Sequence, residues 1–189
     1  MPEAQTPPRR RRLAAFGAAL PLLLVAGWFA STKVARMLSN AAIQAPVGRP
    51  LPAFRLTARD GRVWSDADLR GRQAVLHFFR SRCEGCEAEA SAMRQLERAL
   101  DPARVVLLHV MTDAVLGFPA ELAAATLAQT QFQRPVLMAD AAFVAALQSV
   151  RWSTVTPVTY VVDSAGMIRG GLRGVQTVAS VQQALAANE

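Results

Sequence analysis

Short apolar runs and amphipathic stretches alternate along residues 50–189 and predict a series of strands and helices. The runs at 74–79 (AVLHFF) and 104–110 (RVVLLHV) are compact and apolar, as buried strands are, and a helical period covers residues 83–100 between them. A strand, a helix and a strand in this order indicate parallel neighbours joined by a right-handed crossover. The pattern therefore predicts an α/β domain.

A hairpin is expected before this unit, and a second hairpin with a closing helix after it. Two extended pieces flank Asp60-Gly61, a pair that suits a tight turn because both positions tolerate positive φ. Between the hairpins we expect a central helical insertion. The later elements are predicted as helices at 120–131 and 141–150, strands at 136–138, 158–162 and 168–172, and a final helix at 178–187.

Residues 1–49 follow a different pattern. Residues 13–32 hold no charge over twenty positions, which as a helix is long enough to cross the hydrocarbon core of a bilayer. Four arginines at 9–12 precede this run, whereas only Lys33 and Arg36 follow closely. The positive-inside rule then predicts a cytoplasmic N-terminus and places the rest of the chain on the periplasmic side of the inner (cytoplasmic) membrane.

A cleaved signal peptide is the competing interpretation, since it shares the basic start, but its apolar region usually spans about 7–15 residues. Small residues around 40–45 would still permit cleavage, although we expect a retained anchor. The chain then divides into a basic cytoplasmic N-terminus (1–12), a transmembrane anchor (13–32), a linker (33–49) and a domain (50–189). The linker contains proline and glycine and lacks a convincing apolar period.

The net charge of +7 raises the question of nucleic-acid binding, which depends on where the positive charge lies. Residues 1–49 carry seven of the 21 basic groups and one of the 14 acidic groups, so the rest of the chain has 14 basic groups against 13 acidic ones. A nearly neutral domain is poorly suited to a phosphate backbone, whose binding relies on counterion release. We expect no nucleic-acid partner.

The only two cysteines, Cys83 and Cys86, are separated by two residues where the first buried strand gives way to a helix. A helix N-terminus stabilises a thiolate, and a C-x-x-C pair there suits reversible disulfide exchange. A structural disulfide and half of a zinc site are the alternatives. A zinc site would need two more ligands, and His77 and His109 lie in apolar strands, where we expect packed residues. We therefore predict a redox pair and neither a metal nor a cofactor.

One stripe of the predicted helix follows three- and four-residue steps through Cys86, Glu89, Met93, Leu96 and Leu100. Because this stripe faces the core, Glu89 should be partly desolvated, and burial favours the protonated form of a carboxyl group. Glu89 would lie one turn from Cys86 and could exchange a proton with that thiol, although an ordinary exposed glutamate is the alternative. Glu87 and Glu97 are expected to be exposed.

Two longer segments resemble the thioredoxin-like oxidoreductases of the TlpA and ResA type. The run AVLHFFRSRCEGCEAEASAMRQLERAL lies at the centre of the first, and VTPVTYVVDSAGMIRGGLRG resembles the family's cis-proline strand and terminal hairpin. The resemblance covers residues 50–189, and the anchor also matches. It implies a thioredoxin-like fold with Cys83 as the attacking thiol, Cys86 as the resolving thiol and Glu89 as the buried acid. Pro157, otherwise only a strand-starting residue, would be the cis-proline facing the disulfide, and Thr156 would border the substrate peptide through its backbone.

The chain departs from the family at two positions beside the cysteines. Family members usually carry tryptophan before the first cysteine and often proline before the second, where this chain has Arg82 and Gly85. These positions tune redox potential and substrate contact, so the departures put the direction of electron flow and the partner in doubt. Arg80 and Arg82 would stabilise a Cys83 thiolate and nearby glutamates would oppose it, but solvated loop charges are the simpler interpretation.

The leading hypothesis is a membrane-tethered thiol-disulfide oxidoreductase that acts on exported proteins as a reductant, with apocytochrome c among the substrates that the resemblance implies. A reductant outside the cytoplasm needs electrons from across the bilayer, so the resemblance also implies a membrane electron-donor thiol protein. A disulfide-forming oxidase would use the same residues. A Sco-like copper-handling protein fits less well, because that family uses C-x-x-x-C and a distant histidine. Peroxiredoxins place a threonine where this chain has Arg80.

Overall fold

The structure is a computed structural model that describes residues 28, 30–148 and 154–188. The chain divides into two units, with the boundary between residues 38 and 39. In the described part of the first unit, residues 28 and 30–38 are helical. No helix within the described residues combines the length and the apolar character needed to cross a membrane. The predicted transmembrane segment at 13–32 falls mostly outside the described residues and stays a prediction.

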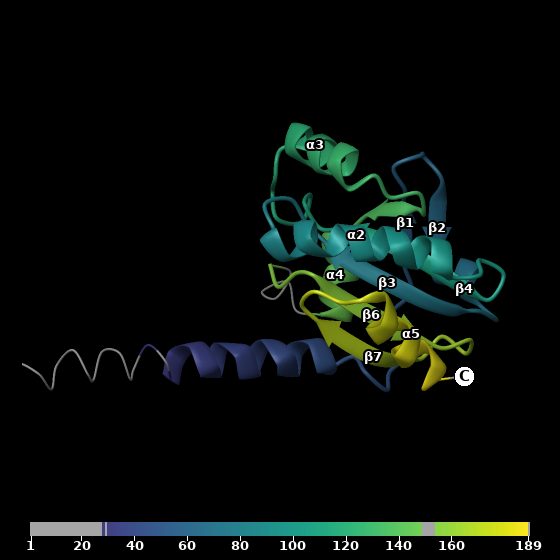
Figure 1. The fold of residues 1–189 in the computed structure, drawn as a ribbon, viewed down its shortest axis with the longest axis horizontal. Coiled ribbons are helices and arrows are strands. Elements are labelled where there is room, and N and C mark those ends of the chain that lie inside the picture. Colours follow the sequence, from purple (N-terminus) through teal and green to yellow (C-terminus); the bar gives the residue numbers. More distant parts are fainter. Residues whose placement is uncertain (1–27, 29, 149–153, 189) are drawn as a thin grey trace, which may run out of the picture. The chain divides into compact units, whose positions relative to one another are not determined.

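The second unit contains almost every element that the hydrophobic pattern predicts (Figure 1). In chain order these are β1 (Arg55–Thr57), β2 (Val63–Ser65), the 3-10 helix η1 (Asp66–Leu69), β3 (Gln73–Phe79), α2 (Glu84–Ala99), β4 (Val105–Met111), α3 (Ala120–Thr130), β5 (Val136–Met138), α4 (Ala141–Leu147), β6 (Val158–Val162), β7 (Ile168–Arg173) and α5 (Val178–Ala186). The sequence pattern missed η1 and the helical residues 33–44, which it assigned to the linker. The helix expected at 141–150 ends at Leu147, before residues 149–153, which are not described.

Five strands form one sheet in the order β5-β4-β3-β6-β7. The central strand β3 runs parallel to β4 and antiparallel to β6, and β7 runs antiparallel to β6. The strand β1 pairs separately with β2 as the predicted hairpin. This topology confirms the expected α/β architecture, with a parallel β3-α2-β4 unit and a terminal hairpin followed by a helix.

Alternate residues of the central strands face opposite sides of the sheet, as strand geometry requires. On one side Leu76 packs in a cluster with α4 and the β1-β2 hairpin. On the other side Val75 and Phe79 pack with α2, α3 and α5, and Figure 1 shows α2 and α5 on the same side of the sheet. His77 shares this second side, and His109 pairs with it in register. Both histidines therefore face α2.

The second half of the predicted linker belongs to the domain. The helical turns continue to residue 44, and Ile43 is fully buried in the core. Gln44 Nε2 donates to the carbonyl of Gly171 in β7, and Ile168 N donates to the carbonyl of Arg49 at 2.9 Å. Only Ile43, Pro46 and Val47 contribute apolar side chains to the core from this segment, and they are too few to establish a period in the sequence, so the pattern predicts a tether at residues 39–49.

Gly171 tests this attachment, because a Cβ there would lie 2.8 Å from the carbonyl oxygen of Ile43. We expect Gly171→Ala to lower the free energy of unfolding by about 1–3 kcal/mol, since backbone must move to relieve the overlap. Gly170→Ala is the matched control, because its Cβ would have only ordinary contacts, 4.0 Å from Val161. Urea unfolding of the two variants measures the difference, and equal stabilities would contradict the packing described here.

Candidate active site

Cys83 and Cys86 form a disulfide at the start of α2, with their Cα atoms 5.2 Å apart. Cys83 is the N-cap residue of the helix, and Cys86 lies in its first turn. Both residues lie at the place that the sequence predicts, where the chain leaves β3 and turns into a helix. Cys83 is 6% and Cys86 5% exposed, so only a small part of the disulfide is open to an approaching molecule.

The loop between β3 and the disulfide is held by a buried acid from the neighbouring strand. Asp113, just after β4, accepts hydrogen bonds from the backbone N–H of Ser81, at 2.8 Å, and from the Ser81 hydroxyl. The hydroxyl also lies 2.6 Å from Thr126 Oγ1 in α3. Arg82 has a left-handed φ of 52°, which side chains other than glycine rarely adopt. These contacts fix the loop that presents Cys83.

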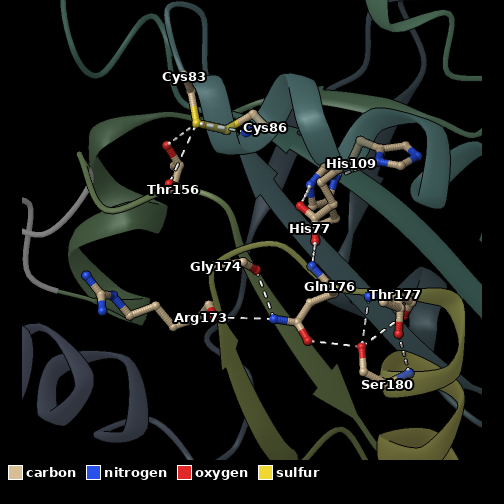
Figure 2. A network of polar contacts seen from close by, with 11 residues as sticks. His77, Cys83, Cys86, His109, Thr156, Arg173, Gly174, Gln176, Thr177 and Ser180 are labelled. Atoms are coloured by element: carbon tan, nitrogen blue, oxygen red, sulfur yellow. Dashed lines mark hydrogen bonds and ion pairs between the residues drawn. A yellow bond between two sulfur atoms is a disulfide. The ribbon is translucent and has the colours of Figure 1, made fainter.

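The peptide bond between Thr156 and Pro157, just before β6, is cis. Figure 2 shows Thr156 next to Cys83 of the disulfide. The Thr156 hydroxyl donates to Cys83 Sγ at 3.4 Å, and the Thr156 carbonyl oxygen lies 3.6 Å from the same sulfur. The close approach depends on Gly85, because a Cβ there would lie 3.0 Å from Pro157 Cδ. The structure thus brings together the cysteines, Thr156 and Pro157.

Cys83 Sγ has more stabilising donors than Cys86 among the described contacts. It accepts from the backbone N–H of Cys86 at 3.1 Å as well as from Thr156. Arg80 folds back on the loop, where its guanidinium donates to the carbonyl oxygens of Ser81 and Arg82. Once the disulfide is reduced, donors of this kind favour negative charge on the first sulfur. Cys83 is therefore the better candidate for the attacking thiolate.

Glu89 is fully buried, as its place on the core-facing stripe predicts. Its Oε2 lies 3.0 Å from His77 Nε2, and its Oε1 accepts from the backbone N–H of Gln176 at 2.6 Å. Figure 2 shows Gln176 among further contacts at the start of α5. Glu89 follows Cys86 by one helical turn. A carboxyl group held between an imidazole and an amide behind the disulfide can hold or release a proton there.

The expectation that Glu97 is exposed is wrong, because its side chain is 3% exposed. Its Oε1 accepts from the backbone N–H groups of Gln133 and Arg134, both at 2.9 Å, and lies 3.0 Å from His109 Nε2. These donors compensate for the burial of the carboxylate. A sequence signal existed, since Glu97 falls between Cys86 and Ala90 on the helical wheel, within the buried sector of α2.

His77 and His109 are packed strand residues, as expected, but their rings also contact each other, with the two Nδ1 atoms 2.9 Å apart. Burial lowers the pKa of His109 to about 4, against the opposing effect of Glu97. Burial also acts to raise the pKa of Glu97, but hydrogen bonds from His109, Arg134 and Gln133 outweigh it and the pKa falls below its usual value. At neutral pH His109 is neutral and Glu97 is ionised.

A groove borders the disulfide between α2 and α3. Its lining includes Cys86, Glu87, Arg80, Arg82 and Arg94 together with apolar side chains such as those of Phe79 and Ala90. Within the described residues, no group of three or more histidine, cysteine or acidic side chains is arranged to hold a metal ion.

Solved structures of low sequence identity share this fold. The thioredoxin domain of the thiol-disulfide oxidoreductase BVU-2223 from Bacteroides vulgatus is 19% identical with a TM-score of 0.60, over 72% of this chain and 96% of that chain. A thiol:disulfide interchange protein of the thioredoxin family from Chlorobium tepidum is 22% identical with a TM-score of 0.58, over 76% and 96%. The fold is thioredoxin-like, as predicted.

The sequence also matches a known family, because residues 47–170 fit the AhpC/TSA family. The chain belongs to this family, and the matched span contains both cysteines. A Coxiella burnetii protein with the provisional name peroxiredoxin bcp is 34% identical over 70 residues, which are 36% of this chain and 46% of that protein. The chain thus spans less than half of that relative. Family and fold together support the predicted class, an oxidoreductase of thiols and disulfides.

The Thr156 hydroxyl gives a first test of the site. In the reduced domain, Thr156→Val should lower the fraction of ionised Cys83 at neutral pH, because the thiolate loses a donor worth about 1 kcal/mol, or roughly fivefold. The alkylation rate of Cys83 by iodoacetamide, followed from pH 5 to 9, measures this fraction. Thr154→Val, at an exposed position two residues earlier, is the control and should leave the rate unchanged. Equal rates in both variants would show that the hydroxyl has no influence on the sulfur.

Acid should destabilise the domain through His109. The unfolded chain protonates this histidine below pH 6.5, whereas the folded domain does so only near pH 4. Stability should therefore fall as the pH drops from 6.5 to 4, by at most about 1.4 kcal/mol per pH unit from this group. Ionised Glu97 stabilises the fold above pH 4.5, and this contribution is lost as the pH falls through its lowered pKa. Urea unfolding at pH 7, 6 and 5 should show a smaller slope for His109→Gln than for the wild type.

Proposed function

We propose that this chain is a membrane-tethered thiol-disulfide oxidoreductase that acts on exported proteins through Cys83 and Cys86. The observation that carries the proposal is their disulfide at the start of α2, against the Thr156–Pro157 loop. A bond between residues three apart removes little entropy from the unfolded chain, so a purely structural disulfide would contribute little there. Its position at a helix N-terminus fits exchange chemistry instead.

In the reductive direction, the Cys83 thiolate attacks a substrate disulfide. A bond forms between Cys83 Sγ and one substrate sulfur, and the other substrate sulfur leaves as a thiolate. Cys86 then loses its proton and attacks Cys83 Sγ, which closes the Cys83–Cys86 disulfide and releases the second substrate thiolate. The substrate gains the two electrons that the cysteine pair loses. An incoming dithiol reverses these steps and reduces the pair again.

The Thr156 backbone and the groove beside Cys86 supply a surface for the substrate chain. The Thr156 carbonyl lies next to the sulfur that forms the mixed disulfide. The groove carries three arginines, Arg80, Arg82 and Arg94, against the single acidic residue Glu87. We propose that it accepts an extended polypeptide segment that flanks the substrate cysteine.

The tether rests on the charge-free run at 13–32 and the arginines before it. Described helical residues at the end of this run and just after it expose large apolar side chains, with Trp28 65%, Met37 71% and Leu38 52% exposed. Exposed apolar residues next to an apolar segment fit contact with a bilayer. We propose that the catalytic domain lies on the periplasmic side of the inner membrane and receives electrons from a membrane thiol protein.

We propose that the chain acts as a reductant, and that apocytochrome c is among its substrates, in keeping with the TlpA and ResA resemblance. The oxidase direction would use the same sulfurs. The reduction potential of the Cys83–Cys86 couple, measured against glutathione, separates the two directions, because a low potential fits a reductant and a high potential an oxidase.

A peroxidase is the second candidate, because one relative carries the peroxiredoxin name. The position three residues before Cys83 is Arg80, whose guanidinium donates to loop carbonyls and provides no hydroxyl for a peroxide. Consumption of hydrogen peroxide by the reduced domain, as fast as its reduction of protein disulfides, would favour this candidate.

The proposal predicts distinct outcomes for the two cysteines. Cys83→Ser should abolish the reduction of insulin disulfides, because the one cysteine that remains, Cys86, lacks the hydrogen-bond donors that favour a thiolate at Cys83. Cys86→Ala should still attack but should accumulate the mixed disulfide, since nothing resolves it. Mass spectrometry of the trapped species from an extract of exported proteins would identify substrates. Insulin reduction by Cys83→Ser at the wild-type rate would refute the proposal.

A further inference from the structure

Five arginines line two neighbouring hollows along one side of α2. The first hollow is the groove beside the disulfide, and the second is a depression farther along the helix. Arg94 lines both hollows, so they adjoin at this residue. We call the five residues the arginine track, which consists of Arg80 and Arg82 at the disulfide end, Arg94 in the middle, and Arg98 and Arg134 at the far end.

The charge of the arginine track is not neutralised by ion pairs. Within the part of the chain that the structure describes, none of its guanidinium groups pairs with an acidic side chain. Exposed arginines elsewhere on the domain do form such pairs, since Arg62 lies 3.8 Å from Asp68 and Arg169 lies 2.7 Å from Asp163. The track therefore differs from the rest of the surface.

Two glutamates line the same hollows, and they offset only part of the positive charge. Glu87 lies in the groove beside the disulfide. Glu97 lines the depression, but its carboxylate is buried and already accepts hydrogen bonds from the backbone N–H groups of Gln133 and Arg134. Five guanidinium groups against two carboxylates leave positive charge in excess, and such a surface attracts anions.

Backbone carbonyl groups hold three of these arginines in place. Arg80 donates to carbonyl oxygens of its own loop. Arg94 Nη1 donates to the Thr130 carbonyl at 2.9 Å, and Arg134 Nη2 donates to the Leu100 carbonyl at 3.2 Å. A carbonyl group fixes a guanidinium without neutralising it and leaves other N–H groups free to donate. The three side chains are half-buried, where an unpaired charge is costly, and an anionic ligand would remove that cost.

We propose that the arginine track binds an acidic segment of the substrate polypeptide, so that the protein prefers disulfides flanked by aspartate or glutamate. The proposal rests on the function proposed above and names the class of substrate. The groove opens beside the disulfide, where a polypeptide substrate must lie, and a planar guanidinium can bind a carboxylate through two N–H groups. Apolar side chains in the same groove, such as Phe79 and Ala90, offer contacts to the rest of the segment.

The length of α2 between the disulfide and Arg94 sets where the acidic residue should lie in the substrate. Arg94 follows Cys86 by eight residues, which corresponds to about 12 Å along a helix. An extended chain covers that distance in about four residues. We therefore expect the strongest effect from an acidic residue about four positions from the substrate cysteine.

Peptides whose single cysteine is joined to thionitrobenzoate by a disulfide test this preference. Cys83 of the reduced full-length protein attacks the peptide sulfur, and thionitrobenzoate leaves as a coloured thiolate. The peptides carry aspartate, asparagine or lysine four residues before or after the cysteine. On at least one side, the aspartate peptide should reach half of its maximal rate at about fivefold lower concentration than the asparagine peptide. The lysine peptide should need a higher concentration, and the maximal rates should agree.

Arg94 is the residue to change, because it lies two helical turns from the cysteines and makes no contact with either sulfur among the described residues. Arg94→Glu should remove the preference for the aspartate peptide and lower the concentration that the lysine peptide requires. Arg55→Glu is the matched control, since it makes the same change of charge at an exposed position of β1, whose hairpin packs on the other side of the sheet. It should keep the wild-type preference.

Salt gives a readout on the wild type that does not depend on any variant folding. In 0.5 M sodium chloride the difference between the aspartate and asparagine peptides should fall below about twofold, because salt screens charges at a surface. A difference that persists in salt, or equal half-maximal concentrations for all three peptides in dilute buffer, would overturn an electrostatic role of the arginine track.

The same assay distinguishes failure of this proposal from failure of the proposed function. Release of thionitrobenzoate from all three peptides without a preference would overturn only the acidic segment. No release from any peptide would overturn the proposed function. Inorganic phosphate competes in a final arm. Phosphate that inhibits as strongly as a cysteine-free aspartate peptide at equal concentration would indicate a site for small anions and would overturn a polypeptide ligand.

Discussion

Parallel pairing of β3 with β4 places the groups of the candidate site, because the two strands end side by side. Phe79 pairs with Met111, so the loop that carries the first cysteine and the turn that carries Asp113 leave the sheet at the same edge. The Ser81–Asp113 hydrogen bonds then hold that loop in place. The same register sets one histidine beside the other, two residues before each strand ends.

Two buried acids of α2 also constrain how that helix packs. Glu89 contacts His77 of β3 and Glu97 contacts His109 of β4, so the helix satisfies both contacts only at one rotation and one position along the sheet. A purely apolar interface would tolerate small slips of the helix. Unsatisfied buried charges would make such slips costly here. The cysteine pair at the helix start is positioned by this restriction.

Most of the fold could be predicted from the sequence, because apolar residues recur with a recognisable spacing in buried strands and amphipathic helices. The placement of Cys83, Cys86 and Glu89 followed for the same reason. The pairing of His77 with His109 depends on strand register, which no local pattern encodes. Burial of Glu97 depends on backbone donors from a loop 36 residues away, and burial of Ile43 on a glycine in β7. These features required the tertiary structure.

Gly85, in the two-residue spacer between the cysteines, also packs against Pro157. Its missing side chain leaves the room that Pro157 occupies, so the spacer is part of the packing that keeps the Thr156 carbonyl beside the sulfur. In this chain, a bulkier dipeptide borrowed from another protein would move the neighbouring loop as well as retune the sulfurs. A side chain at residue 85 would therefore change the redox potential of the cysteine pair and the position of the Thr156 loop together.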